Sequence, residues 1–369
     1  MSVLAIPSLY LHVPFCVKRC DYCAFYTLAD STAPMRAGYL DRLKQEIAAA
    51  APSCGPLQHI YVGGGTPTFL SHGELRRLFD GLFAHMRLDA GAEFSVEANP
   101  QSLTDETLDL LLGYGVTRIS LGAQSFNDRV RTAIGRYGEA DAVVAAVARL
   151  RSRGVVNYNL DLIYGAPEQT LADLEVDLER FLEMEPAHIS TYSLMVEPGT
   201  PLARRGTTEA ADDLLADMWT AIGERLAAAG IHRYEVSNHA RPGHECRHNR
   251  HVWYGGPFMG IGPSASWYDG DSRWTNVADL KLWQGGRGPI EDRLQPEHRA
   301  REILAYGLRV ATGWQRPAFR AATGYDYRAL CGETLDSLAA DGMIVATDDS
   351  IRIPTEKLIL ADYVARELL

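Results

Sequence analysis

The strongest constraint on the fold is a regular alternation of apolar, strand-like runs with amphipathic helical patterns before residue 230. The strand-like runs are residues 9–13, 59–63, 93–97, 118–122, 156–163 and 188–194. Between them, apolar residues recur at spacings of three and four, the period of one helix face. Strands and helices in alternation predict a parallel sheet with helices on its outside. Six units are fewer than the eight of a closed TIM barrel, so we expect an α/β fold, a partial (β/α)6 TIM-like barrel.

Three cysteines follow the first strand-like run in a C-x3-C-x2-C spacing: Cys16, Cys20 and Cys23. Thiolates are the soft ligands that iron–sulfur clusters select. Three of them on one short loop leave one iron of a four-iron cluster open, as a chemical site requires. A zinc site usually takes two ligand pairs that lie further apart. The spacing therefore favours a 4Fe–4S cluster over a zinc knuckle.

Glycines, acids and amides gather where the other strand-like runs end. Residues 63–67 read Gly-Gly-Gly-Thr-Pro, Glu97 ends the third run, and residues 122–125 read Gly-Ala-Gln-Ser. The carboxyl ends of parallel strands meet at one edge, where barrel enzymes place their chemistry. The glycine run lacks the Gly-Lys-Ser/Thr of a phosphate loop. These residues therefore predict a binding site beside the cysteine loop.

The cysteine loop, with Tyr22 before its last cysteine, resembles the radical S-adenosylmethionine (SAM) superfamily. In that superfamily SAM chelates the open iron through its amino and carboxylate groups. An electron from the cluster then cleaves SAM to methionine and a 5′-deoxyadenosyl radical. The resemblance implies a SAM site formed by Tyr10, Tyr22, Gly64, Gly65, Thr66, Glu97, Gln124, Arg136 and Asp161.

Longer segments resemble the oxygen-independent coproporphyrinogen III oxidase-like group, and within it the HemW-type heme chaperones. The matching segments are residues 9–16, 159–167, 192–201 and 234–249. The oxidase carries a further cysteine two residues after the third, where this chain has Phe25. It also has an N-terminal extension, whereas only fifteen residues precede Cys16 here. The resemblance implies a heme chaperone without oxidase activity; a radical methylase, and less so a coproporphyrinogen III dehydrogenase, stay as alternatives.

Residues 248–253, His-Asn-Arg-His-Val-Trp, resemble the His-Asn-x-x-Tyr-Trp motif of the heme chaperones. The resemblance implies that His248 binds heme, and imidazole is a good axial ligand of heme iron. Trp253 is then expected to pack on the porphyrin, and Val252 departs from the motif's tyrosine. The alternatives for this histidine-rich segment are a solvated polar loop and a zinc site of His244, Cys246 and His248.

We expect three parts: the radical SAM barrel in residues 1–230, a glycine- and histidine-rich connection with the heme motif in 231–294, and a winged-helix-like α+β domain in 295–369. In the last part, apolar residues 344–346 and 351–353 bracket a turn-forming run, which predicts a hairpin. This part carries nine Lys and Arg against eleven Asp and Glu. It therefore lacks the basic footprint of DNA binding and is predicted to be a lid or a docking domain.

Composition favours a cytoplasmic protein without a transmembrane segment. The net charge of −11 argues against a general nucleic-acid surface. No run approaches the roughly 20 apolar residues of a membrane span, and residues 1–7 lack the pattern of a signal peptide. Three further cysteines are scattered, which is no disulfide framework. The expected partners are heme, a heme-acceptor protein and an electron donor.

Overall fold

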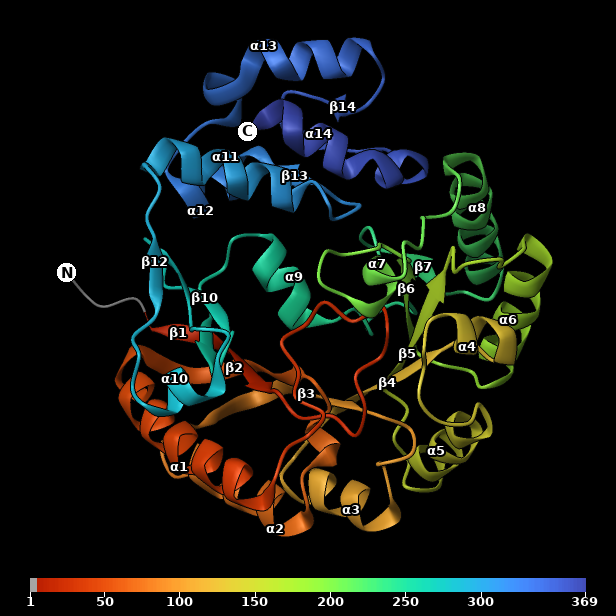
Figure 1. The fold of residues 1–369 in the computed structure, drawn as a ribbon. Coiled ribbons are helices and arrows are strands. Elements are labelled where there is room, and N and C mark those ends of the chain that lie inside the picture. The colour runs from red at the N-terminus through yellow and green to blue at the C-terminus, as the bar shows by residue number, and fades with distance from the viewer. Residues whose placement is uncertain (1–4) are drawn as a thin grey trace.

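The structure is a computed structural model that describes residues 5–369. It is built on a nine-stranded sheet with the order β7-β8-β6-β5-β4-β3-β2-β1-β9 (Figure 1). The first six strands pair in parallel, each with the next along the chain. They are β1 (Ile6–Val13), β2 (Cys54–Gly64), β3 (Leu88–Ala98), β4 (Arg118–Gln124), β5 (Tyr158–Tyr164) and β6 (His188–Ser193). The predicted partial (β/α)6 barrel is confirmed.

Helices cover the outer face of this sheet (Figure 1). The main ones are α1 (Ala33–Ala50), α2 (His72–Phe83), α3 (Asp105–Gly113), α5 (Asp141–Ser152), α6 (Leu171–Glu183) and α8 (Asp212–Ala228). Short helices α4 (Asp128–Ala133) and α7 (Pro201–Arg204) lie in the loops after β4 and β6, and 3-10 turns span Ala51–Ser53 and Pro67–Phe69. The Ser71 hydroxyl and the Glu74 carboxylate form a capping box at the start of α2. The apolar face of α2 packs on the sheet, with Phe79 edge-on to Phe94 at 5.6 Å.

Short strands extend the sheet at both edges. β8 (Asn238–Ala240) pairs antiparallel with β6, and β7 (His232–Arg233) pairs antiparallel with β8. β9 (Met259–Ile261) pairs in parallel with β1 at the other edge. Gly262, next to β9, has φ +103°, and a Cβ there would lie 2.5 Å from the His12 carbonyl oxygen. The glycine-rich run around β9 therefore serves close backbone approach to β1.

The segment between β8 and the C-terminal part contains a short helix, a small antiparallel sheet and a second short helix. Helix α9 (Arg247–Trp253) lies between the barrel and the C-terminal helices (Figure 1). β10 (Ser266–Tyr268), β11 (Arg273–Thr275) and β12 (Ile290–Asp292) form a three-stranded antiparallel sheet, and α10 (Leu280–Gln284) packs on α1.

The C-terminal part combines helices with a small antiparallel sheet of order β13-β15-β14. Its elements are α11 (Pro296–Gly307), β13 (Trp314–Gln315), α12 (Arg316–Thr323), α13 (Tyr327–Ala340), β14 (Val345–Ala346), β15 (Ser350–Arg352), a 3-10 segment (Thr355–Leu360) and α14 (Ala361–Leu368). β14 and β15 form the hairpin that the sequence predicts. Within residues 5–369, no helix is long and apolar enough to span a membrane.

Candidate functional site

The three loop cysteines lie directly beyond the carboxyl end of β1. Backbone hydrogen bonds hold this loop: the Cys16 amide donates to the Leu28 carbonyl at 3.1 Å, and the Cys23 amide donates to the Cys20 carbonyl at 3.2 Å. The Arg19 guanidinium donates to the Cys23 carbonyl. All three cysteines are free thiols. The loop therefore wraps its sulfurs around one region instead of linking them in a disulfide.

The electrostatic surroundings of these sulfurs fit a metal cluster. Burial raises the pKa of the Cys16 thiol to about 11, and the nearby sulfurs of Cys23 and Cys20 add to the rise. The Arg136 guanidinium donates to the Cys20 sulfur at 3.6 Å. Thiolates this close repel one another unless a cation balances them, so the three sulfurs suit the irons of a 4Fe–4S cluster.

The glycine run at the end of β2 packs against the cysteine loop. The Gly65 amide donates to the Val13 carbonyl and the Thr66 amide to the Phe15 carbonyl, each at 2.8 Å. A Cβ on Gly65 would lie 3.0 Å from the Cys16 sulfur and 2.8 Å from the Phe15 oxygen. The Thr66 hydroxyl lies 3.6 Å from that same sulfur. Glycine is required here because any side chain would push the two loops apart.

Two carboxylates face each other inside the barrel. Glu97 accepts hydrogen bonds from the Tyr61 hydroxyl at 2.9 Å and the Gly64 amide at 3.0 Å. Asp161 accepts one from the Asn159 amide group at 2.7 Å. Burial, followed by the charge of Asp161, raises the pKa of Glu97 to about 7. Burial also raises the pKa of Asp161. A bound cation, such as an amino group, would stabilise both carboxylates in their ionised form.

The remaining predicted SAM residues surround these groups. Gln124 has φ +74°, a strained value for a residue other than glycine, beside a register shift between β4 and β5. Arg136 donates to the Gly122 carbonyl. Burial and the adjacent Cys20 sulfur raise the pKa of Tyr22, which packs on an apolar cluster beside the loop. Tyr10 lies deeper, and its hydroxyl is 2.9 Å from His12 Nδ1.

Two further residues, which the sequence analysis did not single out, form hydrogen bonds with the predicted site residues. Tyr61 lies between Ile60 and Val62 on β2, points to the barrel interior and binds Glu97. His12 links Tyr10 to the Tyr26 carbonyl at 3.0 Å. Both are polar side chains within buried strand runs, and that pattern is the signal that could have revealed them.

His248, the predicted heme residue, is buried at the base of the barrel. Its Nδ1 lies 2.9 Å from the Ser8 hydroxyl. Its ring stacks on Tyr61 and Tyr10, with centroids 5.4 Å and 6.5 Å away. Burial lowers the pKa of His248 to about 3. The ring is therefore neutral, and it is enclosed between its own helix, α9, and the strands β1 and β2.

Two residues that precede α9 and one at its end contact separate partners. His244 Nδ1 lies 3.4 Å from the Asn157 side chain, and the Cys246 thiol is 3.6 Å from Glu93. Among residues 5–369, no three His, Cys, Asp or Glu side chains are arranged to hold a single metal ion. Trp253 packs on the C-terminal part, 5.0 Å beneath the Arg309 guanidinium.

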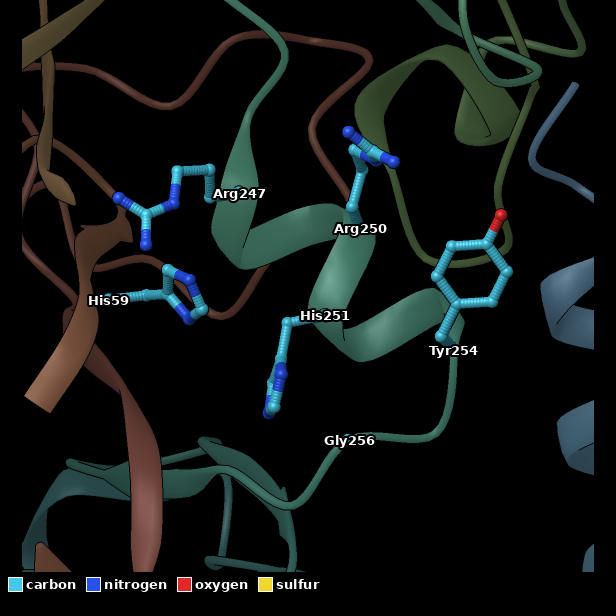
Figure 2. A pocket seen from close by; sticks show the side chains of 6 residues that line it. All are labelled: His59, Arg247, Arg250, His251, Tyr254 and Gly256. Atoms are coloured by element: carbon cyan, nitrogen blue, oxygen red, sulfur yellow. The ribbon is translucent and has the colours of Figure 1, made fainter. Parts of the chain in front are cut away.

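A pocket of about 360 Å³ opens between β2 and α9. Its lining residues are His59, Arg247, Arg250, His251, Tyr254 and Gly256 (Figure 2). The sequence placed no binding residue at His59.

Comparisons with known proteins agree with this architecture. Residues 10–181 match the radical SAM superfamily. The chain is 36% identical to the heme chaperone HemW of Mycobacterium tuberculosis, over 98% of this chain and 94% of the relative. It is 33% identical to the HemW of Bacillus subtilis, over 97% of each. The Escherichia coli coproporphyrinogen III oxidase HemN, a radical SAM enzyme, has the same fold, with a TM-score of 0.85 and 24% identity over 99% of this chain and 90% of HemN.

Proposed function

The chain belongs to the HemW family within the radical SAM superfamily, and from this we propose that it is a heme chaperone that binds heme and passes it to an acceptor protein. The observation that carries the proposal is the identity of 33–36% to HemW proteins, which extends over nearly the whole of both chains. The likeness therefore includes α9 and the C-terminal part as well as the barrel.

The superfamily's cofactors are a 4Fe–4S cluster and SAM. When bound, the cluster supplies the electron that cleaves SAM. We assign Cys16, Cys20 and Cys23 to the cluster because their sulfurs lie on one loop beside a guanidinium. We assign Glu97 and Asp161 to the amino or ribose groups of SAM, because a paired, buried carboxylate site suits a cation.

His248 is the heme residue that the motif suggests. In the described conformation its ring is enclosed by Ser8, Tyr10 and Tyr61. Heme would reach this imidazole only after α9 moved away from the barrel. The proposal for His248 therefore includes a displacement of α9.

The remaining partners are also proposals. An electron donor must reduce the cluster if SAM is cleaved, and an acceptor must take up the heme. All six cysteines are free thiols, which supports a reducing compartment, the cytoplasm.

The first experiment separates the chaperone from the two enzyme alternatives. Reconstituted protein is given reductant, SAM and coproporphyrinogen, and in parallel is loaded with heme and mixed with an apo-hemoprotein. We expect heme to move to the acceptor at a rate above its release into buffer, and no protoporphyrinogen to form. Phe25, two residues after Cys23, is 68% exposed and offers no thiol for the oxidase reaction. Multiple turnovers to protoporphyrinogen would overturn the proposal, and failure of heme transfer would favour the radical methylase.

A further inference from the structure

The pocket between β2 and α9 is lined by two imidazoles, two guanidinium groups, a phenol and a glycine, and no acidic side chain of the described residues lines it. Figure 2 shows His59, on β2, pointing toward α9. The facing residues of α9, Arg247, Arg250 and His251, are three and four positions apart and so share one side of the helix. Glu93 pairs with His59 in the sheet, but its carboxylate accepts from backbone amides at the start of α9. The lining therefore carries positive charge that none of its own side chains balances.

The two guanidinium groups belong to residues one helical turn apart on α9. Within residues 5–369, neither Arg247 nor Arg250 forms an ion pair with a side chain. Arg247 uses one terminal nitrogen of its guanidinium to donate to the Gly91 carbonyl, at 2.8 Å. Like charges one helical turn apart repel each other. An anion that both guanidinium groups bind would remove this repulsion.

The surroundings of the two imidazoles disfavour a cation in the pocket. Burial, followed by the nearby His251 and Arg247, lowers the pKa of His59 to about 4. Burial also lowers the pKa of His251, whose Nε2 lies 2.8 Å from the Pro257 carbonyl oxygen. His59 Nδ1 is buried and has no hydrogen-bond partner among the described residues. Positive charge that disfavours a proton on His59 also disfavours a metal ion beside it, so the pocket favours an anion.

Size and charge together indicate that the anion is a phosphate group. The pocket volume of about 360 Å³ is at the lower end of the range for small-molecule sites, roughly 300–1,000 Å³. An apolar ligand would leave the charged groups desolvated and without partners. A carboxylate brings one negative charge, whereas a phosphate ester carries about −1.5 to −2 at pH 7 and has three acceptor oxygens. Because a guanidinium group pairs with phosphate through two parallel hydrogen bonds, this charge matches two arginines.

We propose that this pocket binds a phosphate group, with Arg247 and Arg250 bound to its oxygens and His59 contacting it from β2. The ligand connects α9 to β2 and holds the helix on the barrel. The site is separate from the SAM site, because at about 3.3 Å per residue His59 lies about 13 Å along β2 from Gly63. It goes beyond the proposed transfer of heme and does not depend on it.

The ligand class is tested by calorimetric titration of the full chain at constant ionic strength, so that general screening of charge stays equal. The probes are inorganic phosphate, ribose 5-phosphate, ribose and acetate. We expect the two phosphate probes to bind at one saturable site, ribose not to bind, and acetate to bind at least about ten-fold more weakly than phosphate. Tighter binding of ribose 5-phosphate than of phosphate would identify a phosphorylated small molecule as the source of the group, and equal binding would identify free phosphate.

The residues are tested with Arg247→Gln, Arg250→Gln and the control Arg287→Gln, which changes an exposed arginine outside the pocket lining. We expect each of the first two variants to weaken ribose 5-phosphate binding about ten-fold, the loss of a hydrogen-bonded charge, and the control to bind like the wild type. Wild-type affinity in the Arg247→Gln/Arg250→Gln double variant would show that the proposal is wrong. So would acetate binding as tightly as phosphate, or no saturation by either phosphate probe.

The connection between α9 and β2 has its own test, amide hydrogen exchange with saturating ribose 5-phosphate or with ribose. A ligand that contacts both elements opposes the opening of α9. We therefore expect slower exchange in Arg247–Trp253 with ribose 5-phosphate, and unchanged exchange in the hairpin of β14 and β15, which serves as the internal control. Bound ribose 5-phosphate that leaves the exchange of α9 unchanged would contradict the contact with His59.

Discussion

Cys20 is the one loop cysteine with a guanidinium beside its sulfur, at 3.6 Å from Arg136. The side chain of Cys20 is also buried. Cys54 is the first residue of β2 and lies at the other end of that strand from the glycine run that packs on the cysteine loop.

We expect Cys20→Ala to abolish the cluster and Cys54→Ala to leave it intact. Loss of one of three thiolates opens a second iron and destabilises the whole cubane. Iron and sulfide analysis after anaerobic reconstitution should fall from about four irons per chain to near zero for Cys20→Ala. Full iron content in that variant would remove the cluster assignment.

The raised pKa of Glu97 predicts a pH dependence of SAM binding. The groups around this carboxylate are Asp161, Arg118 and the Tyr61 hydroxyl. With a pKa of about 7, Glu97 is largely protonated at pH 6 and ionised at pH 8, and only the ionised form attracts a cationic amino group. We therefore expect SAM affinity to rise up to about ten-fold from pH 6 to pH 8.

The matched control for this dependence is Glu97→Gln, which has no charge to titrate. Its SAM affinity should be low and nearly constant over the same range, measured by equilibrium dialysis on reconstituted protein. A wild-type affinity that falls as pH rises would show that Glu97 does not bind the amino group.

At the scale of elements, the position of α9 depends on a carboxylate from β3. Cys246 at the start of α9 provides no side-chain cap. Glu93 takes that role: it accepts from the Arg247 amide at 3.0 Å and the His248 amide at 3.3 Å. It is also one of several acidic groups whose charge acts on the buried Arg118.

We expect Glu93→Ala to lower the free energy of unfolding by about 2 kcal/mol, because the acceptor that caps α9 is lost. Glu93→Gln keeps an acceptor and should cost less. Glu106→Ala, at a carboxylate 82% exposed, is the control and should change little. Chemical denaturation measures all three, and a wild-type stability for Glu93→Ala would rule out the cap.

The elements differ in how far the sequence could predict them. The six barrel strands were predictable, since each is a run of β-formers between helical patterns. β9 was not, because three residues within a glycine-rich run carry no periodicity and depend on pairing with β1. The capping box of α2 was readable from Ser71 and Glu74, whereas the cap of α9 comes from β3, distant in the sequence.

At the scale of the whole molecule, α9 joins the barrel to the C-terminal part. One side of it buries His248 against Tyr61, and its end places Trp253 against Arg309 and Tyr306 of the C-terminal part. The sequence could predict the cluster ligands, because the cysteine spacing is typical of an iron–sulfur site, and it could predict SAM through the resemblance to a family. It could not predict that His248 is enclosed, because that burial depends on residues about 240 positions away.

Heme binding by the intact protein is the measurement that tests the central claim most directly. The anaerobically reconstituted chain is titrated with heme and followed by its Soret band, with a cluster-free Cys20→Ala sample in parallel. We expect saturation at one heme per chain, with a spectrum of histidine-ligated iron in both samples, because His248 lies beside Ser8 near the start of β1, whereas the cysteine loop follows the end of that strand. Absorbance that rises without saturation and matches free heme would contradict the claim that this chain is a heme chaperone.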